Sequence, residues 1–243
     1  MNETEARALW GVNGTLALEL AVPFRAVRDR IAYEDGAGAP FTPPTPDTHH
    51  RNETLARVAD VRLGVQAARV APPWTLTASG GVYLPTGRTE SNPFALGRLG
   101  LPRQHLQFGH GTVDPFASAA ASRRAGKWSL TAATSARLTL NENANGYRAG
   151  DRFGLSVAAA HAIRGGWAAR GGLDLAREQA ERWSGAIEEE GNLGRSDLFL
   201  ALGASRMFTG VGTVGVTARL PLASAATGAQ ADLPLVLQLA WTK

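Results

Sequence analysis

The chain has 243 residues, no cysteine and a formal net charge of +4 at pH 7. The absence of cysteine excludes disulfide bonds and any metal site with thiolate ligands. The positive charge comes almost entirely from dispersed arginines, whereas a nucleic-acid binder would gather them in one patch. No run of about 18 apolar residues predicts a membrane-spanning helix. Because no linker or change of composition divides the chain, we expect one domain over residues 1–243.

Large apolar residues alternate with small or polar ones along most of the chain. After the first turn, for example, Leu16, Leu18 and Leu20 fall on one face of a strand, while Glu19 falls on the other. This period of two predicts β-strands with one apolar and one polar face. In chain order the predicted strands are residues 4–10, 15–30, 55–70, 74–86, 105–123, 128–140, 151–163, 167–182, 195–208, 212–223 and 231–242.

The connections between these strands are short and long in turn. Short turns rich in Gly, Pro and Asn fall at residues 12–14, 71–73, 124–127, 164–166 and 209–212, and longer connections separate them. This asymmetry is typical of outer-membrane barrels, whose periplasmic turns are tight and whose external loops are long. Such barrels close with an even number of strands in bacteria. We therefore expect a signal peptide and a twelfth strand upstream of Met1, or a first segment that is frayed or pairs differently.

Five of the six tryptophans lie beside the short turns or at the end of the chain. Tryptophan is enriched where a membrane protein crosses the boundary between water and lipid. The spacing predicts a girdle on the periplasmic side. Its members are Trp10, Trp74, Trp128, Trp167 and Trp241.

Alternation by itself leaves two architectures open, because it does not show which face of the sheet contacts water. A soluble barrel or sandwich would turn the leucines into a dry core, as lipocalin-type barrels of about eight strands do. Eleven or twelve strands form too wide a tube to fill in that way, and two packed sheets would not explain tryptophans at one level. The sequence therefore favours an all-β, antiparallel up-and-down transmembrane β-barrel of about 12 strands in the outer membrane of a Gram-negative bacterium. Its expected partners are the lipid bilayer and the barrel-assembly machinery, with no nucleic acid.

On this interpretation the polar face lines the lumen and carries charges of both signs. The predicted lumen-lining residues are Glu19, Arg25, Asp60, Arg62, Arg137, Arg170, Asp174, Glu178, Asp197 and Arg219. Two hypotheses remain open. The charges either pair across strands and brace a nearly closed lumen, or they line a narrow passage that selects the permeant.

The alternation changes phase near residues 109–112. An extra residue in a strand resets which face its side chains take, so the change predicts a β-bulge or kink. Bulges occur both as simple bends and at functional positions. The candidates for a bulge or gate are Gly109, His110, Gly111, Asp114 and Phe116.

Three segments resemble a known family. The first, over residues 10–24, contains WGVNG and LAVPF, the second reads GGVYLPTG at residues 80–87, and the third reads LQFGHGTVDP at residues 106–115. They are similar to the outer-membrane proteins associated with the meta-pathway of phenol degradation, which are related in general character to channels for fatty acids and hydrocarbons. The resemblance implies a twelve-stranded barrel and a transporter of small hydrophobic or aromatic solutes.

Other chemistry is not indicated. His49 and His50 are adjacent in a proline-rich loop without the spacing of metal ligands, and no serine, histidine and acid combination marks an esterase. We expect no catalytic residue, no metal and no cofactor, and therefore no enzyme. The predicted function is passive transport through the barrel of small, apolar or aromatic molecules, whose class rests on the resemblance. The alternative is a non-conducting barrel that acts as a surface receptor or scaffold through its long loops.

Overall fold

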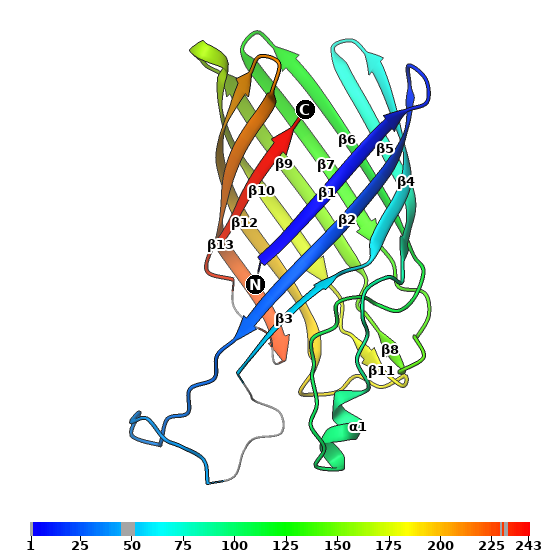
Figure 1. Ribbon diagram of the computed structural model, residues 1–243. Coiled ribbons are helices and arrows are strands. Elements are labelled where there is room, and N and C mark those ends of the chain that lie inside the picture. The colour runs from blue at the N-terminus through cyan, green and yellow to red at the C-terminus, as the bar shows by residue number, and fades with distance from the viewer. Residues whose placement is uncertain (1, 45–51, 229, 231–232) are drawn as a thin grey trace.

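The computed structural model describes residues 2–44, 52–228, 230 and 233–243. Within them, one antiparallel sheet curls strongly around a central axis (Figure 1). His49 and His50 lie outside the described residues. The strands of this sheet are β1 (Asn2–Gly11), β2 (Leu16–Asp29), β3 (Glu53–Val58), β4 (Val61–Ala71), β5 (Trp74–Leu84), β6 (Asp114–Ala125), β7 (Trp128–Arg137), β9 (Arg152–Ala162), β10 (Trp167–Glu178), β12 (Asn192–Phe208), β13 (Gly212–Gly228) and β14 (Val236–Thr242).

Neighbouring strands in the sheet follow one another along the chain. Eleven of the described strands form the continuous order β1-β2-β4-β5-β6-β7-β9-β10-β12-β13-β14, and β3 pairs with β2 beyond the end of β4. Every pairing is antiparallel, as an up-and-down barrel requires. β1 and β14 are the two edges of the described sheet and run in the same direction, because an even number of antiparallel steps separates them.

Most strands form where the alternation predicts them, but two interpretations are wrong. The predicted strand over residues 55–70 is interrupted at Ala59 and Asp60, where the Thr86 hydroxyl donates to the Ala59 carbonyl and accepts from the Val61 amide. A side chain thus takes the place of a neighbouring strand at this break. The predicted strand over residues 105–123 is wrong in its first half, because β6 begins only at Asp114.

The strand ends also differ from the predictions. β12 begins earlier and β13 ends later than predicted, at Asn192 and Gly228, because the two pair with each other over almost their whole length. β7 and β10 end earlier, at Arg137 and Glu178. β14 is described only from Val236, while residues 231 and 232 lie outside the description. Strand ends are set by pairing between neighbours, which the alternation of one segment does not contain.

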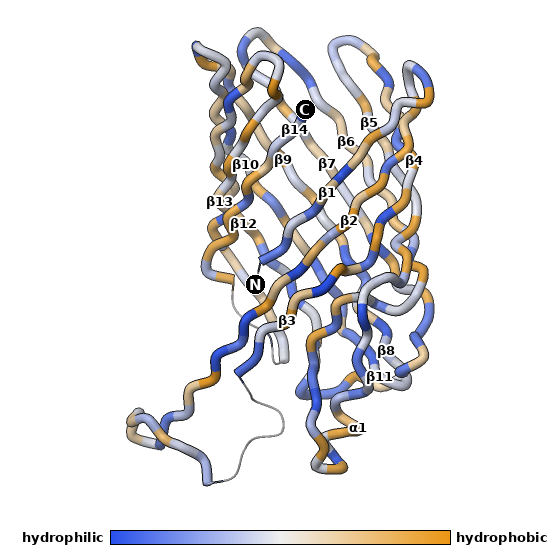
Figure 2. Tube along the Cα trace, in the orientation of Figure 1, coloured by the Kyte–Doolittle hydropathy of each residue, from blue (hydrophilic) through white to orange (hydrophobic). Residues whose placement is uncertain are grey.

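The outer face of the sheet is apolar and exposed. Leu63, Leu155, Leu173 and Leu202 are each between 41% and 50% exposed, although they lie in the middle of paired strands. Figure 2 shows hydrophobic and hydrophilic positions alternating along the strands. Exposed apolar side chains over so large an area mark a surface that contacts lipid or another apolar partner.

The five tryptophans of the predicted girdle are exposed, from 42% for Trp74 to 78% for Trp10. Trp74, Trp128 and Trp167 begin strands at tight turns, and Trp10 and Trp241 are the next-to-last residues of β1 and β14. All these strand ends lie at the upper end of the sheet in Figure 1.

The helices in the described part of the chain are all too short or too polar to cross a bilayer.

The opposite end of the sheet carries a small folded cap. It consists of helix α1 (Pro93–Arg98) and the two-stranded sheet of β8 (Tyr147–Arg148) and β11 (Arg182–Trp183), at the lower end of Figure 1. Pro93 begins α1, and the Asn92 side chain accepts hydrogen bonds from the amides of Phe94 and Ala95. Phe94, Tyr147, Ala149 and Trp183 form a buried cluster. The sixth tryptophan thus differs from the other five, since Trp183 is only 2% exposed and holds the cap together.

Candidate functional site

The predicted lumen-lining residues lie on the face of the sheet opposite the exposed leucines. Residues that are directly paired across two antiparallel strands share a face, and the register aligns Arg62 with Ala21, Arg170 with Gly203, and Asp174 with Ser156. Asp60 lies at the break between β3 and β4 and faces the same side. Among the ten residues, Glu19, Asp60 and Asp197 are almost fully buried. Because these carboxylates are hidden inside the curled sheet, each needs a cationic partner.

Glu19 is held between two arginines. Its Oε1 lies 2.9 Å from Nε of Arg7 on β1 and 2.6 Å from Nη2 of Arg62 on β4. The Glu19 side chain is 1% exposed. The Arg62 guanidinium also lies 5.4 Å from the centre of the Phe116 ring, a cation–π geometry. One buried carboxylate therefore links three neighbouring strands.

Five more of the predicted charges take part in four ion pairs. The ion pairs are Arg25 with Glu3 at 2.9 Å, Arg219 with Asp174 at 2.8 Å, Arg152 with Glu178 at 3.1 Å, and Arg195 with Asp197 at 2.6 Å. Pairing of this kind is what the bracing hypothesis predicts. The partners Glu3, Arg7, Arg152 and Arg195 were missed, although the same alternation places them on the polar face. Arg170 differs, because no acidic partner lies within ion-pair distance among the described residues.

The segment before β6 folds inward instead of bulging. Residues 105–113 are loop, and the amides of Phe108 and Gly109 donate to the carbonyl of Arg88. Gly111 has a φ of 73°, which favours glycine. The change of alternation therefore marks the point where the chain leaves the loop and enters β6. The prediction of a β-bulge at Gly109, His110 and Gly111 is wrong, because no strand exists there to bulge.

This inward loop makes contacts on opposite sides of the lumen. Nη1 of Arg25, on β2, reaches the Gln107 carbonyl at 3.5 Å. The amide of His110 donates to Oδ2 of Asp60 at 2.9 Å, and Asn143, beyond the end of β7, donates to the His110 carbonyl at 2.9 Å. Since β2 and β7 lie four places apart in the sheet order, the loop crosses the lumen between them.

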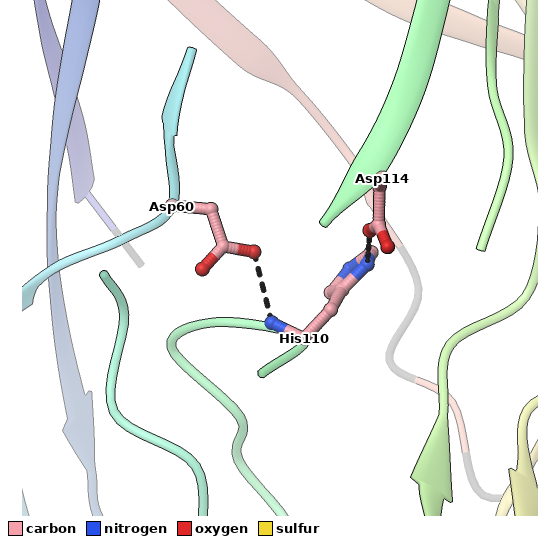
Figure 3. A group of neighbouring side chains, drawn as sticks. All are labelled: Asp60, His110 and Asp114. Carbon is pink, nitrogen blue, oxygen red and sulfur yellow. Dashed lines mark hydrogen bonds and ion pairs between the residues drawn. The ribbon is translucent and has the colours of Figure 1, made fainter. Parts of the chain in front are cut away.

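Asp60, His110 and Asp114 form a buried cluster under this loop (Figure 3). His110 Nδ1 lies 2.5 Å from Oδ2 of Asp114, and the Thr112 hydroxyl donates to Oδ1 of Asp114 at 2.7 Å. Nη2 of Arg137 lies 2.8 Å from Oδ2 of Asp60 and 2.7 Å from Oδ2 of Asp114. One guanidinium thus neutralises two carboxylates that come from different elements.

The same cluster has the composition of a metal site, with one nitrogen and two oxygen ligands within 4.8 Å of one another. The geometry does not fit a metal ion, however, because the Arg137 guanidinium already bonds to both carboxylates from the cationic position. A metal would have to displace a charge that this chain supplies itself. The arrangement is a buried salt-bridge network that fixes the loop to the wall.

Burial changes the titration of several groups at the cap end. Desolvation lowers the pKa of His110 below its ordinary value, although the hydrogen bond that its ring donates to Asp114 opposes the shift. Burial also raises the pKa of the Glu181 carboxyl and of the Tyr147 hydroxyl. His110 is therefore neutral at pH 7, and its Nδ1–H donates to the Asp114 carboxylate.

One cavity inside the curled sheet lies away from this network and another lies against it. The larger, of about 430 Å³, is lined by hydroxyl groups such as Thr77 and Ser156, by alanines, and by Arg7, Arg170 and Arg219. The smaller, of about 160 Å³, lies against the inward loop and is lined by Tyr83, Phe108 and the cluster around Arg137. The lumen is thus polar but contains few unpaired charges.

The chain can now be compared with known proteins. A family model described as "Putative MetA-pathway of phenol degradation" matches residues 3–210. The chain belongs to this family. This confirms the resemblance seen in the three sequence segments.

Among solved structures, the chain is similar to the COG4313 outer membrane channel from Pseudomonas putida F1. The TM-score is 0.66 at 15% sequence identity, and the match covers 98% of this chain and 79% of that chain. A FadL homologue from Pseudomonas aeruginosa matches with a TM-score of 0.42 at 15% identity, covering 90% of this chain and 59% of that one. No curated protein matches the sequence. The first likeness confirms the predicted fold, an all-β curled sheet of the outer-membrane channel type, and the similar protein is described as a channel and not as an enzyme.

Proposed function

We propose that this protein resides in the bacterial outer membrane and acts as a passive channel for small, apolar or aromatic solutes. The observation that carries the proposal is a sheet with exposed leucines outside and a cavity of about 430 Å³ inside. A soluble protein would bury those leucines, whereas lipid can cover them. The cavity size falls in the range of small-molecule sites, about 300–1,000 Å³.

In this proposal the ten polar residues predicted from the sequence line the passage and the five tryptophans form the periplasmic girdle. The inward loop is the gate, because it crosses the lumen and lines the cavity of about 160 Å³. His110 and Asp114 fix it to the wall, and Phe116 lies beside Tyr83 at a ring-centre distance of 5.5 Å. A solute that moves from the cap end to the tight-turn end has to displace this loop.

The solute class follows from the family and from the composition of the cavity. Membership in the phenol-degradation family supports aromatic solutes. The cavity wall combines alanine methyl groups with hydroxyl groups such as those of Thr77 and Ser156, which suits molecules with one apolar and one polar side.

A second candidate is a non-conducting barrel that presents its loops to a partner. It is favoured by the folded cap, whose buried cluster of Phe94, Tyr147 and Trp183 gives the external loops a defined shape. The two candidates make opposite predictions for ion flow through the lumen.

Planar bilayers containing the refolded protein distinguish them. We expect discrete conductance steps, a larger conductance when residues 104–112 are replaced by a short glycine-serine linker, and a lower current when phenol occupies the lumen. Folding of both proteins is checked by the different gel migration of boiled and unboiled detergent samples. A silent bilayer for both folded proteins would reject the channel and favour the scaffold.

A further inference from the structure

Arg170 is unlike the other arginines on the inner face of the sheet. Arg7, Arg25, Arg62, Arg137, Arg152, Arg195 and Arg219 each lie within ion-pair distance of a carboxylate. Among the described residues of this inner face, Arg170, Arg124 and Arg57 have no such partner, and Arg57 on β3, which is aligned with Arg25, lines neither of the cavities beside Arg170. Arg124 is aligned with Ser129 at a tight turn and lines neither cavity beside Arg170. Arg170 therefore carries the one uncompensated charge inside the larger cavity.

The position of Arg170 leaves its guanidinium accessible. Its direct neighbours across the sheet are Ala160 on β9 and Gly203 on β12. Two positions away on its own strand are Ala168 and Gly172, which share its face. All four neighbours have a methyl group or no side chain, so nothing covers the guanidinium and Arg170 is exposed within the lumen.

Two cavities meet at this side chain. Arg170 lines the cavity of about 430 Å³ and also a second one of about 240 Å³ against β12, β13 and β14. The second cavity is lined by uncharged hydroxyl and amide groups together with glycine and alanine, and Arg170 is its only charged lining residue among those described. The register aligns Gly203 with Thr217, so a hydroxyl group lies across β12 from Arg170. A positive charge with hydroxyl donors beside it is a recognition site for an anion.

We propose that Arg170 binds a small organic carboxylate in the lumen, which makes aromatic monocarboxylates a preferred solute class of the channel. The planar guanidinium offers two parallel N–H donors that match the two oxygens of a carboxylate. Alanines such as Ala120 and Ala133 in the same cavity contact the apolar part of the solute. This inference rests on the proposed function for its role in transport, but the binding site can be tested separately.

The chemistry also explains which arginines are left out of the site. Arg62 and Arg137 are engaged with buried carboxylates, and a solute anion would have to displace Glu19 or Asp114 to reach them. Breaking a buried pair is strongly unfavourable, because it leaves an uncompensated charge. Arg170 has no such competitor among the described residues, so its full hydrogen-bonding capacity is available to a ligand.

The test is equilibrium binding of benzoate to the folded protein in lipid nanodiscs, measured by isothermal titration calorimetry at fixed chloride concentration. Benzamide has the same shape without the charge and serves as the matched ligand. Loss of a charge-assisted hydrogen bond weakens binding about 10- to 100-fold. We expect this loss for benzamide, and for benzoate with Arg170→Gln. Arg170→Lys keeps the charge but loses the two parallel donors, so its affinity for benzoate should lie between those of the unaltered protein and of Arg170→Gln. Arg124→Gln, which removes the same charge from the same face, should bind as the unaltered protein does.

Equal binding of benzoate and benzamide, or unchanged benzoate binding by Arg170→Gln, would overturn the site. Benzoate binding that Arg124→Gln weakens as much as Arg170→Gln would also overturn it, since it would indicate a general attraction to the lumen charge. These outcomes are separate from the channel test. A protein that conducts but does not bind benzoate would refute the carboxylate site alone. A protein that binds benzoate but gives no conductance in the bilayer would refute the channel alone.

Discussion

Replacing Arg137 by methionine should loosen the inward loop without unfolding the barrel wall. Arg137 is 14% exposed in its side chain and contacts two carboxylates, Asp60 and Asp114, whose side chains are 2% and 0% exposed. Methionine fills a similar volume but offers no positive charge. The variant leaves two buried carboxylates close together and without their cation.

The expected cost follows from this burial. Removing one partner of a buried ion pair destabilises a protein by about 3–5 kcal/mol. Arg25 provides the contrast, because its partner Glu3 is 44% exposed in its side chain. Such an exposed pair contributes at most about 1 kcal/mol, so Arg25→Met is the matched control.

Two measurements follow the effect. Urea unfolding in lipid vesicles gives the change in the free energy of unfolding, and hydrogen exchange of residues 105–113 reports on the loop. Exchange should accelerate because Asp60 also accepts hydrogen bonds from the amides of Gly87 and His110. Adding Asp60→Asn and Asp114→Asn to Arg137→Met removes the uncompensated charges and should recover at least half of the lost stability.

Equal free energies of unfolding for Arg137→Met and Arg25→Met would show that burial of the carboxylates does not raise the cost of losing their arginine. A triple variant less stable than Arg137→Met would show that the lost stability does not come from unpaired carboxylates.

Three further predictions concern the cap, the loop and the outer face. Because burial lowers the pKa of His110, the unfolded chain binds a proton at a pH where the native loop does not, so the stability of the loop should fall as the pH drops below about 6.5. Hydrogen exchange of the loop amides should show this pH dependence, and His110→Asn should abolish it. A Cβ at position 87 would lie 2.6 Å from the Gly109 Cα, so Gly87→Ala should destabilise the loop by about 1–3 kcal/mol. A Cβ at position 36 would meet no atom within 4 Å, so Gly36→Ala should leave the free energy of unfolding in urea unchanged. Leu173→Arg should lower the free energy of unfolding in vesicles by about 2–4 kcal/mol if the side chain faces hydrocarbon near the midplane. Leu101 is similarly exposed but lies in a loop, so Leu101→Arg should lower it by less than about 0.5 kcal/mol. Equal effects of the two leucine substitutions would argue against a lipid-facing wall.

Much of the fold could be read from local pattern. A period of two is a property of each strand by itself, so the alternation around Leu16, Leu63 and Leu155 was enough to identify the strands and their two faces. The positions of the turns then gave the antiparallel order. The same logic predicted ten charged residues on one face, and the register of the sheet has the nine that lie in strands on one face, while Asp60 lies at a break between two strands.

The inward loop could not be predicted in this way. Leu106 and Phe108 alternate as they would in a strand, yet residues 105–113 are loop, because their amides bond to Arg88 and Asp60 from distant parts of the chain. Trp183 shows the same limit. It has the residue type of the girdle but is buried in the cap, since Phe94 and Tyr147 reach it from two other loops.

The sequence by itself determined the strands, the separation of an apolar face from a polar one, and the family. The tertiary structure decided which inward charges are neutralised and which are left without an acidic partner. An arginine at an inward position looks the same in the sequence whether it is Arg137 or Arg170. The difference arises because curling the sheet brings Asp60 and Asp114 to one of them and only alanine and glycine to the other.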